Sequence, residues 1–291
     1  MHELPEFDVY TPSTLREALS FLSAEGKGSK LLAGGTWLIP RMLKRGVKVD
    51  RLVDLSGLDE LRYIRRAHKT IRIGGLTTVS DIASADILDG RYRCFRRLGH
   101  QFGVEATRNM ATVAGNLAAA AEGDLVEIFH ALDGQVIVQS ARGKRTCDPL
   151  GLGLAEDEVI AEVRVAELEG RVSTWFNKFE NRRENGTGSI TTTTLVKLDD
   201  EGSVADVRIA VNRARERQIG RARLAESELK GRTPDDDGIR HALDTLESEI
   251  SPAGDFRGSS RFRKQVTRAL VNEGVTNCLQ ELGTSRKAEG I

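Results

Sequence analysis

The first fifty-five residues alternate short apolar runs with amphipathic segments. Thr14 and Glu17 have the spacing of a capping box at a helix start, and Gly26 and Gly28 follow as stop signals. Between them, apolar residues recur at helical spacing: Leu15, Ala18, Leu19 and Leu22. Next come an apolar run at 29–33, a glycine turn, a helical stretch at 38–45 and an apolar run at 52–55. This order predicts a compact βαβ-type unit.

The middle of the chain predicts a mixture of strands and short helices. Strands are expected at 71–73, 136–138 and 159–165, and helices at 92–102 and 125–132. The segment 77–82 is typical of a turn with a helix cap, and 111–116 of a second glycine-containing turn.

The last third changes from strands to helices. Strands are expected at 173–179, 190–198 and 204–211, followed by helices at 236–249 and 259–282. Strands followed by helices predict a small three-stranded sheet with packed helices, and therefore an α+β protein. The shifts in pattern divide the chain into regions 1–57, 58–170 and 171–291.

Composition excludes several classes of protein. The 291 residues include 43 Lys plus Arg and 43 Asp plus Glu, so the formal net charge is zero, whereas a general nucleic-acid binder needs a basic excess. No apolar run reaches the roughly 20 residues of a membrane span, and residues 1–6 lack the pattern of a secretory signal. We therefore expect a cytoplasmic protein.

The cysteines and histidines predict neither a metal site nor a catalytic group in this chain. Cys94, Cys147 and Cys278 lie far apart, form no CxxC pair and are expected to be reduced thiols. The five histidines are scattered, without the partners of a hydrolytic triad. Any redox metal should therefore belong to another polypeptide.

The segment Leu31-Leu32-Ala33-Gly34-Gly35-Thr36 carries the first candidate chemistry. Adjacent glycines after a strand let backbone N–H groups approach an anion, and the following helix adds partial positive charge. A side chain at Gly35 is expected to fill the space that a phosphate needs. Taken alone, a Gly-Gly turn is more often structural, and this one matches neither a Walker A loop nor a Rossmann fingerprint.

A second segment of small residues, 108–116, strengthens the interpretation. Thr112 and Asn116 offer hydrogen-bond donors, and Asp124 follows at the start of an apolar helix. Two such segments could hold a diphosphate from both sides, and Asp124 could accept hydrogen bonds from a ribose. A plain helix cap is an equally good explanation of Asp124.

Five ordered segments resemble the FAD-binding (medium) subunits of the xanthine dehydrogenase and carbon monoxide dehydrogenase family. They are the two segments above, Ile73–Thr78, Phe176–Glu184 and Asp255–Arg263. The resemblance runs from about residue 4 to 282. It implies a two-subdomain FAD-binding domain of the vanillyl-alcohol-oxidase-like type in 1–57 and 58–170, and a flavoprotein C-terminal domain in 171–291.

The resemblance also implies roles for individual residues. The stretch 31–36 would wrap the FAD pyrophosphate, the second segment would hold its other side, and Asp124 would contact the ribose or adenosine. Lys178 would lie beside the flavin ring, although a solvated strand lysine is its plain alternative. The residues implied to bind FAD are Leu31, Leu32, Ala33, Gly34, Gly35, Thr36, Trp37, Leu38, Ala111, Thr112, Gly115, Asn116, Ala118, Asp124 and Lys178.

The first functional hypothesis is therefore an electron-transfer subunit of a multi-subunit molybdenum hydroxylase. Its expected partners are a molybdenum-cofactor large subunit and a [2Fe–2S] small subunit, with NAD or another acceptor receiving the electrons. The second hypothesis is a scaffold subunit with weakened flavin binding, because Ala114 replaces a usual glycine and residues 185–188 depart from the family pattern. A stand-alone flavin oxidase is a third option.

Overall fold

The computed structural model describes residues 6–44, 46–88, 90–180, 190–215, 218–255 and 258–283. These residues divide between two units. Unit 1 comprises the chain up to residue 87 together with 102–126 and 133–167, and unit 2 comprises 88–101, 127–132 and everything from 168 onward. The expected subdivision at residue 57 stays a prediction.

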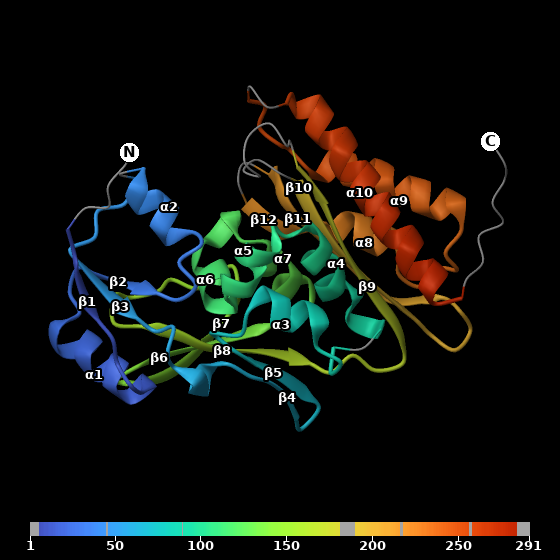
Figure 1. Ribbon diagram of the computed structural model, residues 1–291. Helices are drawn as coiled ribbons and strands as arrows, with labels where there is room; N and C mark the ends of the chain where they lie inside the picture. Colours follow the sequence, from blue (N-terminus) through green and yellow to red (C-terminus); the bar gives the residue numbers. More distant parts are fainter. Residues whose placement is uncertain are drawn as a thin grey trace. The chain divides into compact units, whose positions relative to one another are not determined.

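The first sheet of unit 1 is parallel, with the order β1-β3-β2. Its strands and the helices between them are β1 (Asp8–Tyr10), α1 (Leu15–Glu25), β2 (Ser29–Leu32), α2 (Leu38–Leu43) and β3 (Arg51–Asp54). Neighbouring residues of β3 face opposite sides of this sheet. Val53 packs in the cluster that contains the buried face of α1, whereas Leu52 packs with residues of α2. The predicted βαβ-type unit is confirmed, and the three-residue β1 extends it (Figure 1).

Helix α1 forms for the reason that its sequence indicates. The Thr14 hydroxyl accepts a hydrogen bond from the backbone N–H of Glu17 at 3.1 Å. The Glu17 carboxylate accepts from the N–H of Ser13 at 2.8 Å, one residue before the cap, and from the Tyr10 hydroxyl at 2.9 Å. These bonds satisfy donors that a helix start leaves open.

The second sheet of unit 1 is antiparallel, with the order β4-β5-β8-β6-β7. Its strands are β4 (Ile64–Ala67), β5 (Thr70–Gly74), β6 (Gln135–Ser140), β7 (Gly143–Cys147) and β8 (Val159–Ala166). Val159 and Ala161 of β8 join the cluster around α1, so that helix packs against both sheets. Strands β4 and β7 were not expected, because two of the four residues of β4 and two of the five residues of β7 are charged and interrupt any apolar pattern.

Short helices carry the rest of this region. They are η1 (Asp59–Leu61), α3 (Val79–Ser84), α5 (Glu105–Met110), α6 (Val113–Ala118) and η3 (Ala120–Glu122). The next helix, α7 (Asp124–Ala131), begins in unit 1, and its residues from Glu127 onward belong to unit 2. A capping box of Thr78 and Asp81 starts α3, as the sequence indicates. The prediction of a glycine turn throughout 111–116 is wrong from Val113 onward. There the Thr112 hydroxyl accepts from the N–H of Gly115 at 3.2 Å and starts α6.

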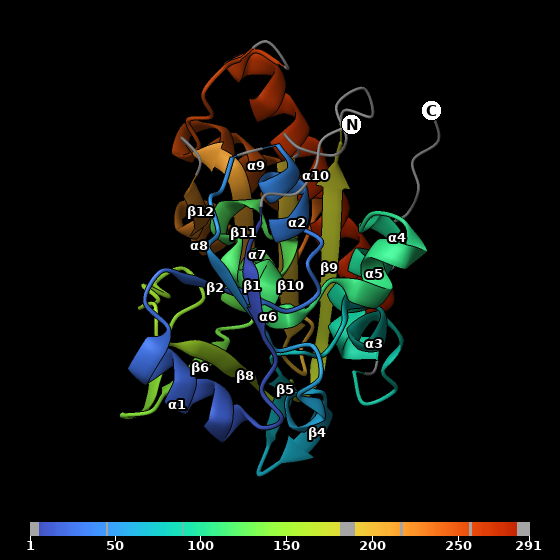
Figure 2. The same ribbon diagram turned by 60° about the vertical axis from the view of Figure 1, so that its left-hand side comes forward.

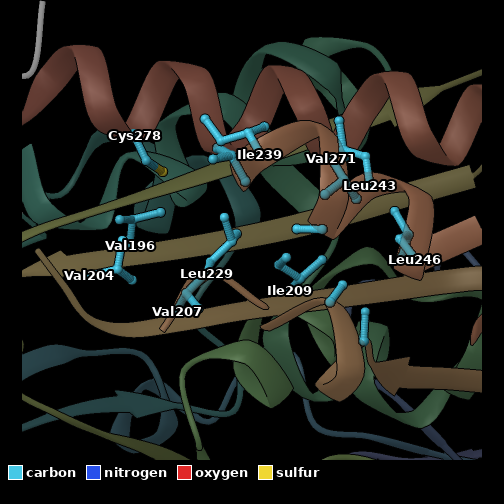
Figure 3. Close-up of a cluster of buried hydrophobic side chains, with 14 of the residues drawn as sticks. Val196, Val204, Val207, Ile209, Leu229, Ile239, Leu243, Leu246, Val271 and Cys278 are labelled. Atoms are coloured by element: carbon cyan, nitrogen blue, oxygen red, sulfur yellow. The ribbon is translucent and has the colours of Figure 1, made fainter. Parts of the chain in front are cut away.

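Unit 2 is built on an antiparallel sheet with the order β12-β11-β10-β9. The elements are η2 (Gly90–Tyr92), α4 (Arg93–Gln101), β9 (Arg171–Phe179), β10 (Ile190–Leu198), β11 (Val204–Arg215), β12 (Gln218–Arg221), α8 (Arg223–Leu229), α9 (Asp236–Glu249) and α10 (Ser260–Glu281). Apolar side chains of β10 and β11 meet those of α8, α9 and α10 in one buried cluster (Figure 3). The three expected strands and two expected helices are present, and β12 and α8 are additional.

Threonines let β10 face two helical layers. Thr194 lies against Gly274 of α10, whereas Thr191 and Thr193 donate hydrogen bonds to the buried carboxylate of Glu127, the latter at 2.8 Å. Helix α4 lies beside β9 in both views (Figure 1 and Figure 2). Alternation of side chains along the strand therefore buries this polar strand on both faces. None of the helices among the described residues is long and apolar enough to cross a membrane.

Candidate functional site

The first candidate loop leaves the carboxyl end of β2 and enters α2. The amides of four consecutive residues, Gly34, Gly35, Thr36 and Trp37, donate to no acceptor among the described residues. Gly35 has a φ of +69°, in the left-handed region. A left-handed residue within a run of N–H donors turns them toward one side, an arrangement that binds anions. Helix α2 has only six residues, so the loop amides themselves are the main donors.

The apolar residues of this loop are used for packing. Leu31 and Ala33 lie against the cluster around α1, whereas Leu32 and Leu38 lie against the cluster around Met42. Their contribution to a ligand would therefore come from the backbone.

The structure contradicts the expectation that a side chain at Gly35 would fill the space of a phosphate. A Cβ at this position would meet Cγ1 of Ile39 at 3.2 Å and Cδ1 of Leu32 at 3.3 Å. Any side chain would thus point at packed side chains rather than into space for a phosphate. Glycine is needed here for the positive φ and for this packing.

The second segment lies directly against the first loop. A Cβ at Gly34 would lie 1.7 Å from the carbonyl oxygen of Met110, so glycine is the residue that permits this approach. Ala111 and Thr112, which follow Met110, are buried. The structure therefore brings together the two segments that the sequence singled out, although they lie some 75 residues apart in the chain.

The second segment is held by the turn at 75–79. The N–H groups of Val79, Val113 and Ala114 donate to the carbonyls of Ala111, Thr77 and Gly75 at 2.9, 3.0 and 2.7 Å. This turn was one of the five resembling segments, and its role in the structure is to support the second.

A buried charge network stabilises the strand ends beneath that turn. Glu162, 3% exposed, accepts hydrogen bonds from Tyr63 at 2.6 Å, Arg72 at 2.7 Å and Arg164 at 2.5 Å. Burial tends to raise the pKa of Glu162, but these hydrogen bonds outweigh it and the net shift is downward. Burial and the bond to Glu162 raise the pKa of Tyr63 to about 12.

The second segment differs from the first in its free donors. The amides of Ala111, Val113, Ala114, Gly115 and Asn116 all donate within the protein. The small residues of the second segment therefore do not leave these five amides open, because the segment starts a helix. What it offers are side-chain donors, the hydroxyl of Thr112 and the amide nitrogen of Asn116.

Asn116 and Asp124 are tied together at the start of α7. The Oδ1 of Asn116 accepts from the N–H of Leu125 at 2.8 Å. Asp124 is the first residue of α7 and is 7% exposed. Its ribose role stays a prediction. Ala118, at the end of α6, is exposed.

Lys178 belongs to unit 2, on β9. Its ammonium lies 2.6 Å from the carboxylate of Glu180, and its side chain is 10% exposed. The plain alternative of a solvated strand lysine does not fit this burial. Its place beside a flavin stays a prediction, and residues 181–189 of the same segment lie outside the described residues.

Sequence reasoning missed two residues beside the first loop, Arg41 and Glu122. The Arg41 guanidinium donates to both carboxylate oxygens of Glu122 at 2.5 Å, and the indole N–H of Trp37 donates to Glu122 at 3.0 Å. These partners stand 81 and 85 residues apart, so no local pattern indicates them.

The donors present fit a diphosphate. Four open amides and the Thr36 hydroxyl lie in one loop, and Thr112 and Asn116 lie in the segment that touches it. The three cysteines are free thiols, and the described part of the chain holds no group of three or more potential metal ligands.

Comparisons with known proteins agree with this arrangement. Residues 5–151 match the family described as the FAD binding domain in molybdopterin dehydrogenase, and residues 175–278 match the CO dehydrogenase flavoprotein C-terminal domain. The glyceraldehyde dehydrogenase medium chain of Sulfolobus acidocaldarius is 27% identical, over 92% of this chain and 96% of the relative. The nicotinate dehydrogenase FAD-subunit of Eubacterium barkeri is 30% identical, over 68% and 71%.

A solved structure shares the fold over almost the whole length. The carbon monoxide dehydrogenase from Hydrogenophaga pseudoflava superposes with a TM-score of 0.88 at 25% identity, covering 96% of this chain and 99% of that one. The expected α+β architecture with an FAD-binding part and a flavoprotein C-terminal part is confirmed.

Proposed function

The chain belongs to the family of FAD-binding domains in molybdopterin dehydrogenases, and from this premise we propose that it is the FAD-carrying electron-transfer subunit of a multi-subunit molybdenum hydroxylase. The observation that carries the proposal is the run of four open amides at 34–37, placed against a second segment with further donors. Such a run suits the pyrophosphate of FAD, because it offers several donors to one anion.

The residues of this chain would bind and orient the cofactor. The amides of 34–37 and the Thr36 hydroxyl would donate to the pyrophosphate, and Thr112 and Asn116 would donate from the second segment. Asp124 would accept from the ribose, and Lys178 would supply positive charge beside the flavin ring. FAD, when bound, supplies a centre that accepts electrons singly and releases them in pairs.

The family membership suggests the partners of this chain, and the described residues include no group of potential metal ligands that could hold a redox metal. We propose a molybdenum-cofactor large subunit, where substrate is oxidised, and a small subunit whose [2Fe–2S] clusters pass electrons to this chain. NAD or another acceptor would receive them. The medium-chain and FAD-subunit names of the relatives support a complex of several chains. The free thiols support a cytoplasmic location.

Residue ranges can be assigned on the same basis. We propose that 1–57 and 58–170 act as the two FAD-binding subdomains and 171–291 as the C-terminal domain. The family matches at 5–151 and 175–278 support a boundary near residue 170.

A visible spectrum tests the proposal. The chain, purified together with the products of its neighbouring genes, should show flavin absorbance or regain it when FAD is added. A preparation without flavin absorbance that also takes up no FAD refutes the proposal. It would favour instead a scaffold subunit, which the engaged amides of Ala111 and of residues 113–116 make the leading alternative.

A matched pair of glycine variants tests the position of the pyrophosphate. Gly35→Ala forces an alanine into a left-handed conformation within the loop, whereas Gly28→Ala does so at a φ of +77° with nothing within 4 Å of the new Cβ. We expect Gly35→Ala to lose FAD and Gly28→Ala to retain it. Equal retention by both variants would show that the pyrophosphate lies elsewhere.

A further inference from the structure

Three side chains join the first loop to the segment that follows α6. The carboxylate of Glu122, at the end of η3, accepts the indole N–H of Trp37 at 3.0 Å and the guanidinium of Arg41 at 2.5 Å. The guanidinium also stacks over the Trp37 ring, 4.1 Å from its centroid. We call this group the clasp, comprising Trp37, Arg41 and Glu122.

The clasp is more than an ordinary surface ion pair. The side chains of Arg41 and Glu122 are 36% and 43% exposed, and an isolated pair of that exposure contributes little because solvent screens it. Here one carboxylate holds two donors from α2 and its cap, and the donors also stack on each other. Trp37 is therefore held by two direct interactions, with Glu122 and with Arg41, and the Arg41–Glu122 pair links these two partners.

The turn that presents Glu122 has a strained backbone. Ala120, the first residue of η3, has a φ of +52°, a conformation that L residues rarely adopt. Strain of this kind persists where surrounding contacts over-determine the backbone, and it concentrates at ligand clamps. The contacts from Glu122 to Trp37 and Arg41 are of the kind that can hold such a turn.

The position of the clasp indicates its role. Trp37 directly follows Thr36 and contributes the last of the four open amides. The contact of Gly34 with Met110 fixes the beginning of the loop, and the clasp fixes its end. We propose that Glu122 is a positioning residue, an inference that rests on the proposed function. Through its contacts with Trp37 and Arg41, Glu122 would hold the loop in the shape that binds the pyrophosphate and so slow the release of FAD.

The dissociation rate of FAD from the full-length chain tests this role. Glu122→Ala should release FAD about tenfold faster, which corresponds to about 1.4 kcal/mol. Trp37→Phe, which removes only the indole donor, should have a smaller effect, and the double variant should release FAD no faster than Glu122→Ala alone. The matched control is Asp157→Ala, which breaks an Arg142–Asp157 ion pair of 2.8 Å in the same unit and should leave the rate unchanged.

The NMR resonance of the Trp37 indole N–H reports on its hydrogen bond to Glu122 when no cofactor is bound. The chain has two tryptophans, so its indole N–H region holds two resonances, and Trp37→Phe identifies one of them. That resonance should shift in Glu122→Ala while the Trp175 resonance stays in place. The inference is overturned by an unshifted Trp37 signal, by a release rate within twofold of wild type, or by an equal acceleration in Asp157→Ala. A wild-type chain that binds no FAD refutes the proposed function itself, a result that the indole signal distinguishes from loss of the clasp.

Discussion

Gly34→Ala is the sharpest perturbation of the joint between the two segments. The new Cβ would lie 1.7 Å from the carbonyl oxygen and 2.6 Å from the carbonyl carbon of Met110, both backbone atoms. Ordinary contact begins at 3.4 Å, so the segments must separate by roughly 1.7 Å. Overpacking of this kind costs about 1–3 kcal/mol. If FAD binding requires the unseparated loops, affinity should fall roughly 5- to 150-fold, at tenfold per 1.4 kcal/mol.

Titration of the apo-chain with FAD, followed by flavin fluorescence, measures that loss. Gly57→Ala is the matched control, because it adds the same methyl group in unit 1 with nothing within 4 Å. Circular dichroism separates loss of binding from loss of the fold. A folded Gly34→Ala variant that binds FAD as tightly as Gly57→Ala would refute the idea that the joint shapes the phosphate site.

Other predictions concern the flavin, acid stability and the thiols. Lys178→Ala should lower the flavin reduction potential by on the order of tens of millivolts with little loss of FAD, because it removes a cation beside the reduced ring. Potentiometry measures this shift, and Lys197→Ala, on the neighbouring strand β10, is the control. The guanidinium of Arg145 lowers the pKa of Glu158 to about 2 from 4.5, so the stability from this shift is complete above pH 4.5 and lost as the pH falls toward 2. Acid-unfolding curves should therefore show the advantage of wild type over Arg145→Gln shrinking across that window. In the native chain, iodoacetamide should modify only Cys147, because the thiols of Cys94 and Cys278 are fully buried. The reaction should be slow, because burial raises the pKa of all three thiols. Rapid modification of a buried thiol, detected by mass spectrometry, would contradict this.

Elements with complete local signals could be predicted from the sequence. Helix α1 has its cap, its periodic apolar face and its stop residue, and α9 spans the expected 236–249 behind the cap of Asp235. Each of these signals acts between residues at most four positions apart. The first candidate loop was identified in the same way, as glycines after an apolar strand.

Elements that depend on strand pairing or on contacts between side chains, rather than on a local sequence pattern, could not be predicted. The sequence analysis expected no strand beyond residue 211 in this part of the chain, but β11 extends to Arg215, residues 218–221 form β12 and Arg223 begins α8. Pairing with a neighbouring strand gives that stretch its conformation, overriding its side-chain pattern. The clasp is a stronger example, because no sequence pattern near Glu122 indicates that it accepts hydrogen bonds from Trp37 and Arg41.

The order of strands in the five-stranded sheet has a consequence for biosynthesis. Gly74 of β5 pairs with Glu162 of β8, so the partners are about 90 residues apart. At a synthesis rate of roughly 5–20 residues per second, β5 remains unpaired on the side that will bind β8 for about 5–20 s. During that interval the nascent chain exposes unpaired backbone groups next to buried-type residues such as Ile71 and Ile73. The sheet of unit 2, β9 to β12, pairs strands that follow one another in the sequence and has no such delay. Early chaperone contact should therefore concentrate on the amino-terminal half of the nascent chain.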